Sequence, residues 1–185
     1  GSLIVTAAGG QYDFIANGRP LLSTDDVRHQ EQTVHYAMAQ RPDARRVLLV
    51  SGGVSGTTGE VLKYGVEAVD YVELDPLVLE VAGRFRPEAL ADPRIEVINT
   101  DGRRFVQTTD RRYDVVIADL PDPATFQLNR FYTAEFFGEV RRILRPGGVL
   151  CFTLGEYANY VDDPLADLLS TARCTLAERF ANVLI

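Results

Sequence analysis

The chain has 185 residues, of which 19 are Lys or Arg and 26 are Asp or Glu, and its formal net charge is −7 at pH 7. With 46% hydrophobic and 24% charged residues, the composition is typical of a globular protein and excludes a disordered tail and a fibre. The apolar runs are no longer than a strand, which excludes within these residues a membrane span of roughly 20 apolar residues. An acidic surface repels phosphate backbones, so we expect no nucleic-acid partner, and a polycationic small molecule suits this charge better.

The first 44 residues predict a small antiparallel sheet and a helix that links it to the rest of the chain. Asn17-Gly18 lies between two apolar runs, a pattern typical of a β-hairpin, because both central residues of a type I′ turn need positive φ. The polar run 23–26 offers caps for a helix over about residues 27–40. The polar break after this helix is the predicted boundary, so residues 1–44 form an N-terminal β-hairpin region with its linking helix.

From residue 45 onward, apolar strands alternate with amphipathic helices. Strands are predicted at residues 47–51, 68–74, 95–99, 113–118 and 149–154, with 181–185 as a last strand. Helices are predicted from the glycine loop to residue 64, from residue 76, and at 133–144 and 164–179. Continuous apolar strands indicate a parallel sheet covered on both faces. The predicted fold class is α/β, a methyltransferase-like (Rossmann-like), doubly wound and mainly parallel sheet preceded by a small antiparallel β-hairpin region.

Cysteine and histidine positions argue against a disulfide framework and a metal site. Cys151 and Cys174 are the only cysteines and form no CxxC, so we expect a reducing compartment, with Cys151 as a buried thiol in an apolar run. His29 and His35 are six residues apart, which is not the i, i+4 spacing of a helical metal pair. We therefore expect no metal.

Polar residues fall where the predicted parallel strands end, which is where open α/β sheets bind their ligands. They are Gly52 and Gly53 after the first of these strands, Glu73 after the second, Asp101 after the third, and Asp119 and Asp122 after the fourth. Each alone is explained as a turn glycine or a helix cap. Four successive strand ends that carry acids along one edge favour a binding site.

The spacing of these residues favours a nucleoside without phosphates. Glu73 follows Gly52 at the distance at which an acid binds a ribose hydroxyl, about 20 residues beyond a glycine loop. The loop is not a clean GxGxxG, and no Arg or Lys stands ready for a pyrophosphate. Asp101 can accept a hydrogen bond from an adenine amino group, and an anionic cluster favours a cationic ligand such as a sulfonium.

Several segments, taken in order, resemble the spermidine synthase family. They are residues 47–53, 72–75, 101–102 and 113–123. The chain is most similar to bacterial spermidine-synthase-like domains that are often fused to membrane segments, which share the loop at 52–56 and the Leu-Asn-Arg-Phe-Tyr run at 128–132. The resemblance implies a methyltransferase-like fold. It also implies aminopropyl transfer from decarboxylated S-adenosylmethionine, the co-substrate, to a diamine such as putrescine.

The same resemblance implies a role for each candidate residue. Glu73 is expected to hold the ribose hydroxyls, Asp101 the adenine amine, and Gln30 to line the donor site. Asp119 is expected to take a proton from the attacking ammonium, and Asp122 to bind the cationic substrate. The resemblance implies Asp119 and Asp122 as the catalytic residues, and it implies no metal. It implies as nucleoside-binding residues Gln30, Gly52, Gly53, Glu73, Asp101, Gly102 and Asp119.

The chain departs from the family pattern in three places. Val54 stands where active synthases have an acid that grips the donor's amino group, and a glutamine that faces the diamine is replaced near Pro20-Leu21. The diamine-binding segment after the sixth strand is absent, because the chain stops at Ile185. Residues 45–185 are thus predicted to be a Rossmann-like nucleoside-binding catalytic domain that is truncated at its C-terminal end.

Two other functions stay open. Val54 removes a donor-selecting acid, which fits a methyltransferase that uses S-adenosylmethionine. Val54 and the missing tail also fit a catalytically weak nucleoside-binding sensor domain of a membrane protein, whereas Asp119 and Asp122 favour an enzyme. We expect a cytoplasmic homodimer, either separate or as a cytosolic domain covalently attached to membrane segments outside this chain.

Overall fold

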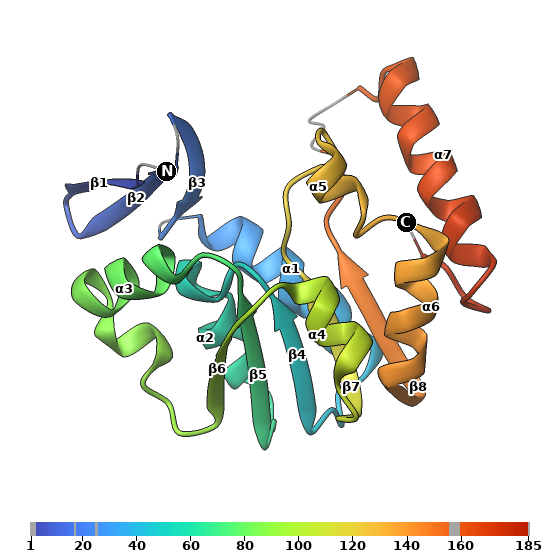
Figure 1. Ribbon diagram of the computed structural model, residues 1–185, viewed down its shortest axis with the longest axis horizontal. Coiled ribbons are helices and arrows are strands. Elements are labelled where there is room, and N and C mark those ends of the chain that lie inside the picture. Colours follow the sequence, from blue (N-terminus) through green and yellow to red (C-terminus); the bar gives the residue numbers. More distant parts are fainter. Residues whose placement is uncertain (1–2, 17, 25, 156–159, 185) are drawn as a thin grey trace.

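The computed structural model describes residues 3–16, 18–24, 26–155 and 160–184. Within them a three-stranded antiparallel sheet precedes a five-stranded parallel sheet with helices on both faces (Figure 1). The predicted α/β fold class is therefore confirmed. None of the described helices is long and apolar enough to cross a membrane.

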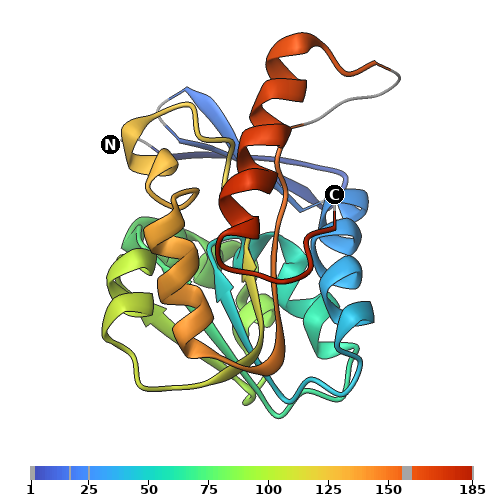
Figure 2. The ribbon, with the colours of Figure 1, turned by 90° about the vertical axis from the view of Figure 1, so that its right-hand side faces the viewer.

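The antiparallel sheet is built from the first three strands. They are β1 (Leu3–Ala8), β2 (Gln11–Ala16) and β3 (Arg19–Ser23), paired in that order. Gly18 has a φ of +77° in the predicted hairpin turn, while Asn17 and the side chains of Pro20 and Leu21 lie outside the described part of the chain. Figures 1 and 2 both place this sheet beyond the carboxyl ends of the parallel strands.

Helix α1 (Val27–Gln40) has the predicted bounds. Asp26 caps it, because its Oδ1 accepts a hydrogen bond from the backbone N–H of His29 at 3.1 Å; Asp25, another candidate cap, lies outside the described residues. Val34 and Met38 are fully buried in the same hydrophobic cluster as the central strands. The helix thus joins the core of the parallel sheet.

The parallel sheet has the strand order β6-β5-β4-β7-β8. Its strands are β4 (Arg46–Val50), β5 (Ala68–Glu73), β6 (Ile95–Asn99), β7 (Tyr113–Ala118) and β8 (Leu144–Phe152). Val50 lies opposite both Val72 and Ala118, so the carboxyl ends of the three inner strands are level. Because the chain moves outward from β4 to β6 and then returns to β7 on the other side, the topological switch point lies between β4 and β7.

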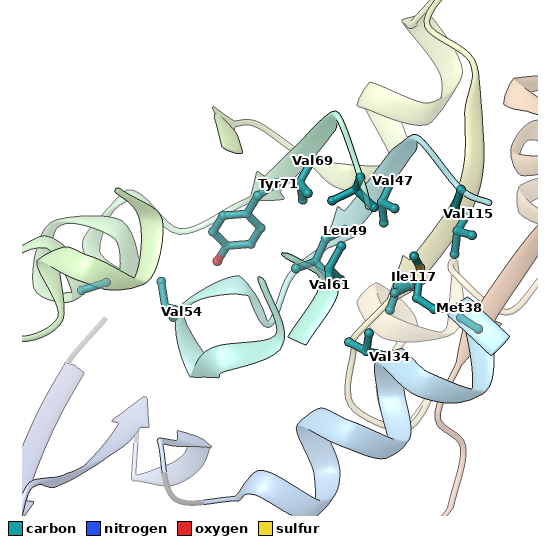
Figure 3. Packing of buried hydrophobic residues seen from close by; sticks show 14 of the residues in the cluster. Val34, Met38, Val47, Leu49, Val54, Val61, Val69, Tyr71, Val115 and Ile117 are labelled. Carbon is teal, nitrogen blue, oxygen red and sulfur yellow. The ribbon is translucent and has the colours of Figure 1, made fainter. Parts of the chain in front are cut away.

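The remaining helices cover the two faces of this sheet. They are η1 (Gly53–Thr57, a π-helix), α2 (Thr58–Leu62), α3 (Pro76–Phe85), η2 (Pro87–Leu90), α4 (Gly102–Thr108), α5 (Phe126–Asn129), α6 (Ala134–Ile143) and α7 (Asp163–Ala177). Val47 and Leu49 of β4 pack with α1, α2 and α3 (Figure 3), whereas Leu48 and Val50 pack with α4 and α6. Figure 2 shows α1 and α6 on opposite sides of the sheet.

Two segments near the end of the chain differ from the prediction. Strand β8 begins at Leu144, directly after α6, rather than at residue 149, and it passes through a positive-φ Gly147 where its register against β7 shifts. A strand was predicted at residues 181–185; over residues 181–184 this was wrong, and Ile185 lies outside the described residues. Strand β8 is at the edge of the described sheet, and residues 181–184 do not pair with it. An apolar run forms a strand only when its backbone groups find hydrogen-bond partners on a neighbouring strand, and this segment has none in the described sheet.

Candidate active site

The loop after β4 has an unusual backbone at the switch point. Ser51 has a φ of +65°, the one positive value at a non-glycine residue among those the structure describes, and Gly52 follows with a φ of +73°. A Cβ on Gly52 would overlap the Asp119 carboxylate. Glycine is therefore required both by the left-handed backbone and by the close approach of Asp119.

The glycine loop continues as the π-helix η1, and Gln30 of α1 supports it. The buried Gln30 amide donates through Nε2 to the Ser55 carbonyl at 3.0 Å and to the Thr24 carbonyl at 3.4 Å. Arg86 donates to the same Ser55 oxygen at 3.2 Å. A Cβ on Gly56, which has a φ of +136°, would come within 2.5 Å of the Gln30 amide oxygen. The structure thus places Gln30 against the glycine loop, with its amide group already bonded there.

Gln30 and Arg86 also line a cavity of about 340 Å³ between α1, the glycine loop and η2. Glu73, Asp101 and Asp119 do not line this cavity. It therefore lies apart from the strand-end carboxylates, on which the rest of the site depends.

Glu73 ends β5 and is 8% exposed. Its Oε2 accepts a hydrogen bond from the Tyr71 hydroxyl at 2.8 Å, and its Oε1 accepts from the Asp75 backbone N–H at 3.1 Å. Burial, reinforced by the neighbouring Glu73 carboxylate, raises the pKa of Tyr71 well above its ordinary value, so the hydroxyl stays a donor. These two bonds fix the carboxylate at the strand end and leave each oxygen with further acceptor capacity.

Asp101 caps α4 directly after β6. Its Oδ1 accepts from the Arg104 backbone N–H at 3.0 Å, and its Oδ2 pairs with the Arg130 guanidinium. Burial disfavours the charge on Asp101, but the Arg104 amide and Arg130 outweigh it and hold the pKa of the carboxyl below its ordinary value. A Cβ on Gly102 would lie 2.6 Å from the Val50 side chain, so glycine lets α4 begin against the end of β4.

Asp119 follows β7, and its backbone N–H continues the ladder to the Val50 carbonyl at 3.0 Å. Its side chain is 8% exposed. Oδ1 lies 2.8 Å from His29 Nε2, and Oδ2 accepts a hydrogen bond from the Thr57 hydroxyl at 3.1 Å. The structure therefore joins the first turn of α1, the glycine loop and the end of β7 at one carboxylate.

Asp122 is exposed three residues beyond Asp119 and is bound to a different part of the chain. Its Oδ1 accepts from the Gly155 backbone N–H, after β8, at 2.8 Å. The Tyr132 hydroxyl donates to the Pro121 carbonyl at 3.0 Å between the two acids. Burial, followed by the charges of Asp122 and Asp119, raises the pKa of Tyr132 above its ordinary value.

Val54, the position where an acid was expected from the resemblance, is 1% exposed. Figure 3 shows it with Tyr71 among the buried residues of one hydrophobic cluster. A carboxylate at this position would have to be buried in that cluster. The valine therefore has a packing role in this chain.

Among the described residues, three side chains of types that can bind a metal lie close together outside this site, on α1 and α2. Ligand atoms of Glu31, His35 and Glu60 lie within 4.8 Å of one another. The Lys63 ammonium, however, lies 2.6 Å from Glu60 Oε2, and His35 Nδ1 lies 2.7 Å from the Tyr64 hydroxyl. Lys63 thus supplies positive charge at this cluster.

Sequence reasoning missed three contacts of the strand-end acids. His29 and Thr57 contact Asp119, and Arg130 contacts Asp101. Arg130 lies in the Leu-Asn-Arg-Phe-Tyr run at 128–132, and this shared motif could have identified Arg130 as a site residue. His29 carried no signal beyond its place beside Gln30, because nothing local shows that the start of α1 meets the end of β7.

Comparison with known proteins identifies the family. The model of the spermine/spermidine synthase domain matches residues 26–174. The chain belongs to this family. The matched residues include the glycine loop and every strand-end acid described above.

Curated relatives of the family align over most of this chain. The polyamine aminopropyltransferase of Oceanobacillus iheyensis is 42% identical over 135 residues, which are 69% of this chain and 26% of that protein. The enzyme of the same name from Korarchaeum cryptofilum is 38% identical over 130 residues, 68% of this chain and 40% of that protein. The chain thus spans about a quarter to two fifths of the length of these two relatives.

Solved spermidine synthase structures share the fold. A spermidine synthase in complex with the transition state analogue AdoDATO superposes with a TM-score of 0.78 at 26% identity, covering 97% of this chain and 66% of that one. The spermidine synthase of Thermotoga maritima gives a TM-score of 0.75 at 25% identity, covering 97% and 65%. The family fold therefore extends over nearly the whole chain, including the antiparallel sheet.

Proposed function

We propose that this chain forms the nucleoside-binding and proton-accepting part of a polyamine aminopropyltransferase. The reaction is transfer of the aminopropyl group from decarboxylated S-adenosylmethionine to a diamine such as putrescine. The observation that carries the proposal is the set of three carboxylates at the carboxyl ends of β5, β6 and β7, namely Glu73, Asp101 and Asp119. The relatives named polyamine aminopropyltransferase, and the related synthase that binds AdoDATO, support it.

In this proposal, the acids after β5 and β6 hold the nucleoside. Glu73 accepts hydrogen bonds from the ribose hydroxyls and Asp101 from the adenine amine. Gly52, Gly53 and Gly102 keep Cβ atoms away from the strand ends: a Cβ on Gly53 would lie 2.6 Å from the Tyr71 ring. Gln30 acts at the donor site by holding the shape of the glycine loop.

The acids after β7 serve the amine. A protonated amine has no lone pair with which to attack carbon, so it must lose a proton, and Asp119 is the base that accepts it. Asp122, more exposed, attracts the second positive charge of the diamine. The sulfonium is already a good leaving group, so alignment and charge placement supply most of the remaining rate enhancement. We propose no metal for this chemistry.

The test is a product assay with matched donors. The purified protein is incubated with putrescine and either decarboxylated S-adenosylmethionine or S-adenosylmethionine, and products are separated by chromatography. We expect methylthioadenosine and spermidine from the first donor. Methylated putrescine from the second donor would instead establish a methyltransferase. Tight nucleoside binding without turnover of any amine would establish a sensor domain, and either result would overturn the proposal.

A homodimer, attachment to membrane segments outside the chain and a domain boundary after residue 44 stay predictions. Sedimentation velocity tests the first. Limited proteolysis tests the boundary, because cleavage is expected first in exposed linkers between domains.

A further inference from the structure

The Arg130 guanidinium is held at three points beside the Asp101 carboxylate. Its Nε donates to the Gln127 carbonyl of α5 at 3.0 Å, and its central carbon lies over the Phe131 ring, 4.9 Å from the ring centre. Its Nη2 donates to Asp101 Oδ2. A cation over an aromatic face is attracted by the ring, so all three contacts favour one position of the guanidinium.

The segment that carries Arg130 is itself anchored to the start of α4. Phe131 is buried in the same hydrophobic cluster as Val50, and a Cβ on Gly102 would lie 3.5 Å from its ring. The Arg130 carbonyl accepts a hydrogen bond from Arg103 Nη1 of α4 at 2.9 Å. Figures 1 and 2 both show α5 beyond the carboxyl ends of the parallel strands. The fold therefore fixes the place from which the guanidinium reaches Asp101.

Asp101 receives one donor on each carboxylate oxygen. The Arg104 backbone N–H bonds to Oδ1 at 3.0 Å, and Arg130 bonds to Oδ2. The carboxylate thus cannot rotate without losing one of these bonds. A carboxylate has about four lone-pair sites, so each oxygen can still accept one more hydrogen bond.

The same contacts keep Asp101 ionised. Burial disfavours its charge, but the Arg104 amide and Arg130 outweigh this effect and lower the pKa of the carboxyl. An ionised carboxylate is only an acceptor, and it suits an amino group as its partner. Because its orientation is already fixed, little ordering is lost when such a ligand binds.

We propose that Arg130 is the positioning residue for base recognition. It holds Asp101 in the orientation that accepts the 6-amino group of a purine, and it thereby sets the preference of the site for a 6-aminopurine. This rests on the nucleoside site of the proposed function. Arg130 acts through Asp101 and needs no contact of its own with the base.

The first test compares two ligands that differ only at the amine. They are methylthioadenosine and its analogue with hydrogen in place of the 6-amino group, and isothermal titration calorimetry measures the Kd of each for the full chain. A hydrogen bond to a charged acceptor should make the wild-type Kd about 10- to 100-fold lower for methylthioadenosine. In Arg130→Met we expect this ratio to fall at least about fivefold, because only the ligand with the amine loses a pre-oriented partner.

Matched variants separate positioning from a loss of charge or of folding. Methionine at 130 can still cover the Phe131 ring, and Arg130→Gln serves as a second variant without the guanidinium. Arg141→Met, at an exposed position of α6, removes the same charge and should keep the wild-type ratio. If Arg130→Met and Arg130→Gln weaken both ligands equally, their effect is merely structural and the inference is wrong.

The second test asks whether Arg130 acts through Asp101. Asp101→Ser removes the carboxylate but keeps a side-chain oxygen that can cap α4. We expect the two ligands to bind Asp101→Ser with nearly equal Kd, and the double variant with Arg130→Met to show no further change in their ratio. A further change in the double variant would mean that Arg130 acts on the base directly, and would overturn the positioning role.

The two proposals fail in different ways. If the wild type binds neither ligand, or binds both equally, the nucleoside site at Asp101 is wrong and the role of Arg130 falls with it. If the wild type prefers methylthioadenosine and both Arg130 variants keep its ratio, the nucleoside site stands and only the role of Arg130 is wrong. If the wild type shows the preference but turns over no diamine, aminopropyl transfer is wrong, and the Kd ratios still decide the role of Arg130.

Discussion

Asp119 is the residue on which most of the site converges, because its two oxygens are bound by His29 and Thr57 and its backbone extends the ladder to β4. Gly52 is its necessary neighbour, since any side chain there would overlap the carboxylate. At the residue scale, the position of the Asp119 carboxylate therefore depends on the absence of a side chain at Gly52.

Replacing Asp119 by asparagine keeps the shape of the side chain but removes the carboxylate that accepts the proton in the proposed reaction. We expect turnover to slow by about 10²- to 10⁴-fold, with nucleoside affinity changed much less, and a partial recovery at higher pH. Methylthioadenosine formation measured from pH 6 to 10 checks this. The exposed Asp167 of α7 provides the control, since Asp167→Asn should be silent. Equal turnover of Asp119→Asn and wild type would remove this residue from the mechanism.

Gly52→Ala tests the space beside Asp119. An alanine held at positive φ costs about 1–2 kcal/mol, and its Cβ also displaces the carboxylate. We therefore expect a lower free energy of unfolding together with a large loss of turnover. Urea unfolding and the product assay measure the two effects. Gly59→Ala in α2 is the matched control: nothing lies within 4 Å of its added Cβ, so it should be neutral or slightly stabilising. If both variants behave alike, the crowding argument is wrong.

At the element scale, the buried carboxylate of Asp114 joins the amino ends of three strands, and the apolar pattern of the sequence did not predict this contact. Asp114 of β7 accepts from the backbone N–H groups of Arg45 and Arg46 and from the Arg145 guanidinium, each at 2.9 Å. It thereby joins β7 to β4 and β8. The strand-end acids of the proposed site, such as Asp119, lie at the opposite ends of these strands, so the proposed site and this junction are separated along the sheet.

Asp114→Asn should show how much this junction contributes. Burial opposes the charge on Asp114, but the two backbone N–H groups and Arg145 outweigh it and lower its pKa. A lowered native pKa stabilises the fold above the ordinary Asp value of about 3.9, and this contribution is lost as pH falls through the native value. We expect a loss of about 1.5–3 kcal/mol at pH 7, shrinking below about pH 4. Urea unfolding across pH measures it, with exposed Asp110→Asn as the control. A pH-independent difference would contradict this assignment.

At the scale of the whole molecule, the antiparallel sheet and the acidic strand ends lie at the same end of the parallel sheet (Figure 1). The net charge of −7 and the carboxylates at this end disfavour phosphorylated nucleotides. A neutral or cationic nucleoside suits the site, and its binding should stabilise the folded chain.

Methylthioadenosine at about 100 times its Kd should add roughly 2.7 kcal/mol to the free energy of unfolding and raise the Tm. Differential scanning calorimetry at several ligand concentrations measures this. Adenosine monophosphate is the matched control, because it carries the same base and ribose with a phosphate that the acids repel. An equal shift with both ligands, or no shift with either at millimolar concentration, would contradict the assigned nucleoside site.

Much of the fold could be predicted because its causes are local. Helix α1 begins after its Asp26 cap, and the bounds of β6 and β7 match the predicted 95–99 and 113–118. Hydrophobic periodicity and capping residues act over a few neighbouring positions, so they can be recognised without the rest of the chain. The strand predicted at 181–184 was wrong because a strand needs a pairing partner that is distant in the sequence, and local patterns do not show whether one is present.

The sequence by itself determined the alternation of strands and helices, the glycine loop and the order of the strand-end acids, and with them the family. Only the tertiary structure decided which groups those acids contact. His29 and Asp119 are 90 residues apart, and Arg130 and Asp101 are 29 apart. Such contacts exist because helix packing across the sheet and the strand order bring separate segments to one edge. No local pattern encodes that meeting, so the contact between His29 and Asp119 was visible only once the chain was folded.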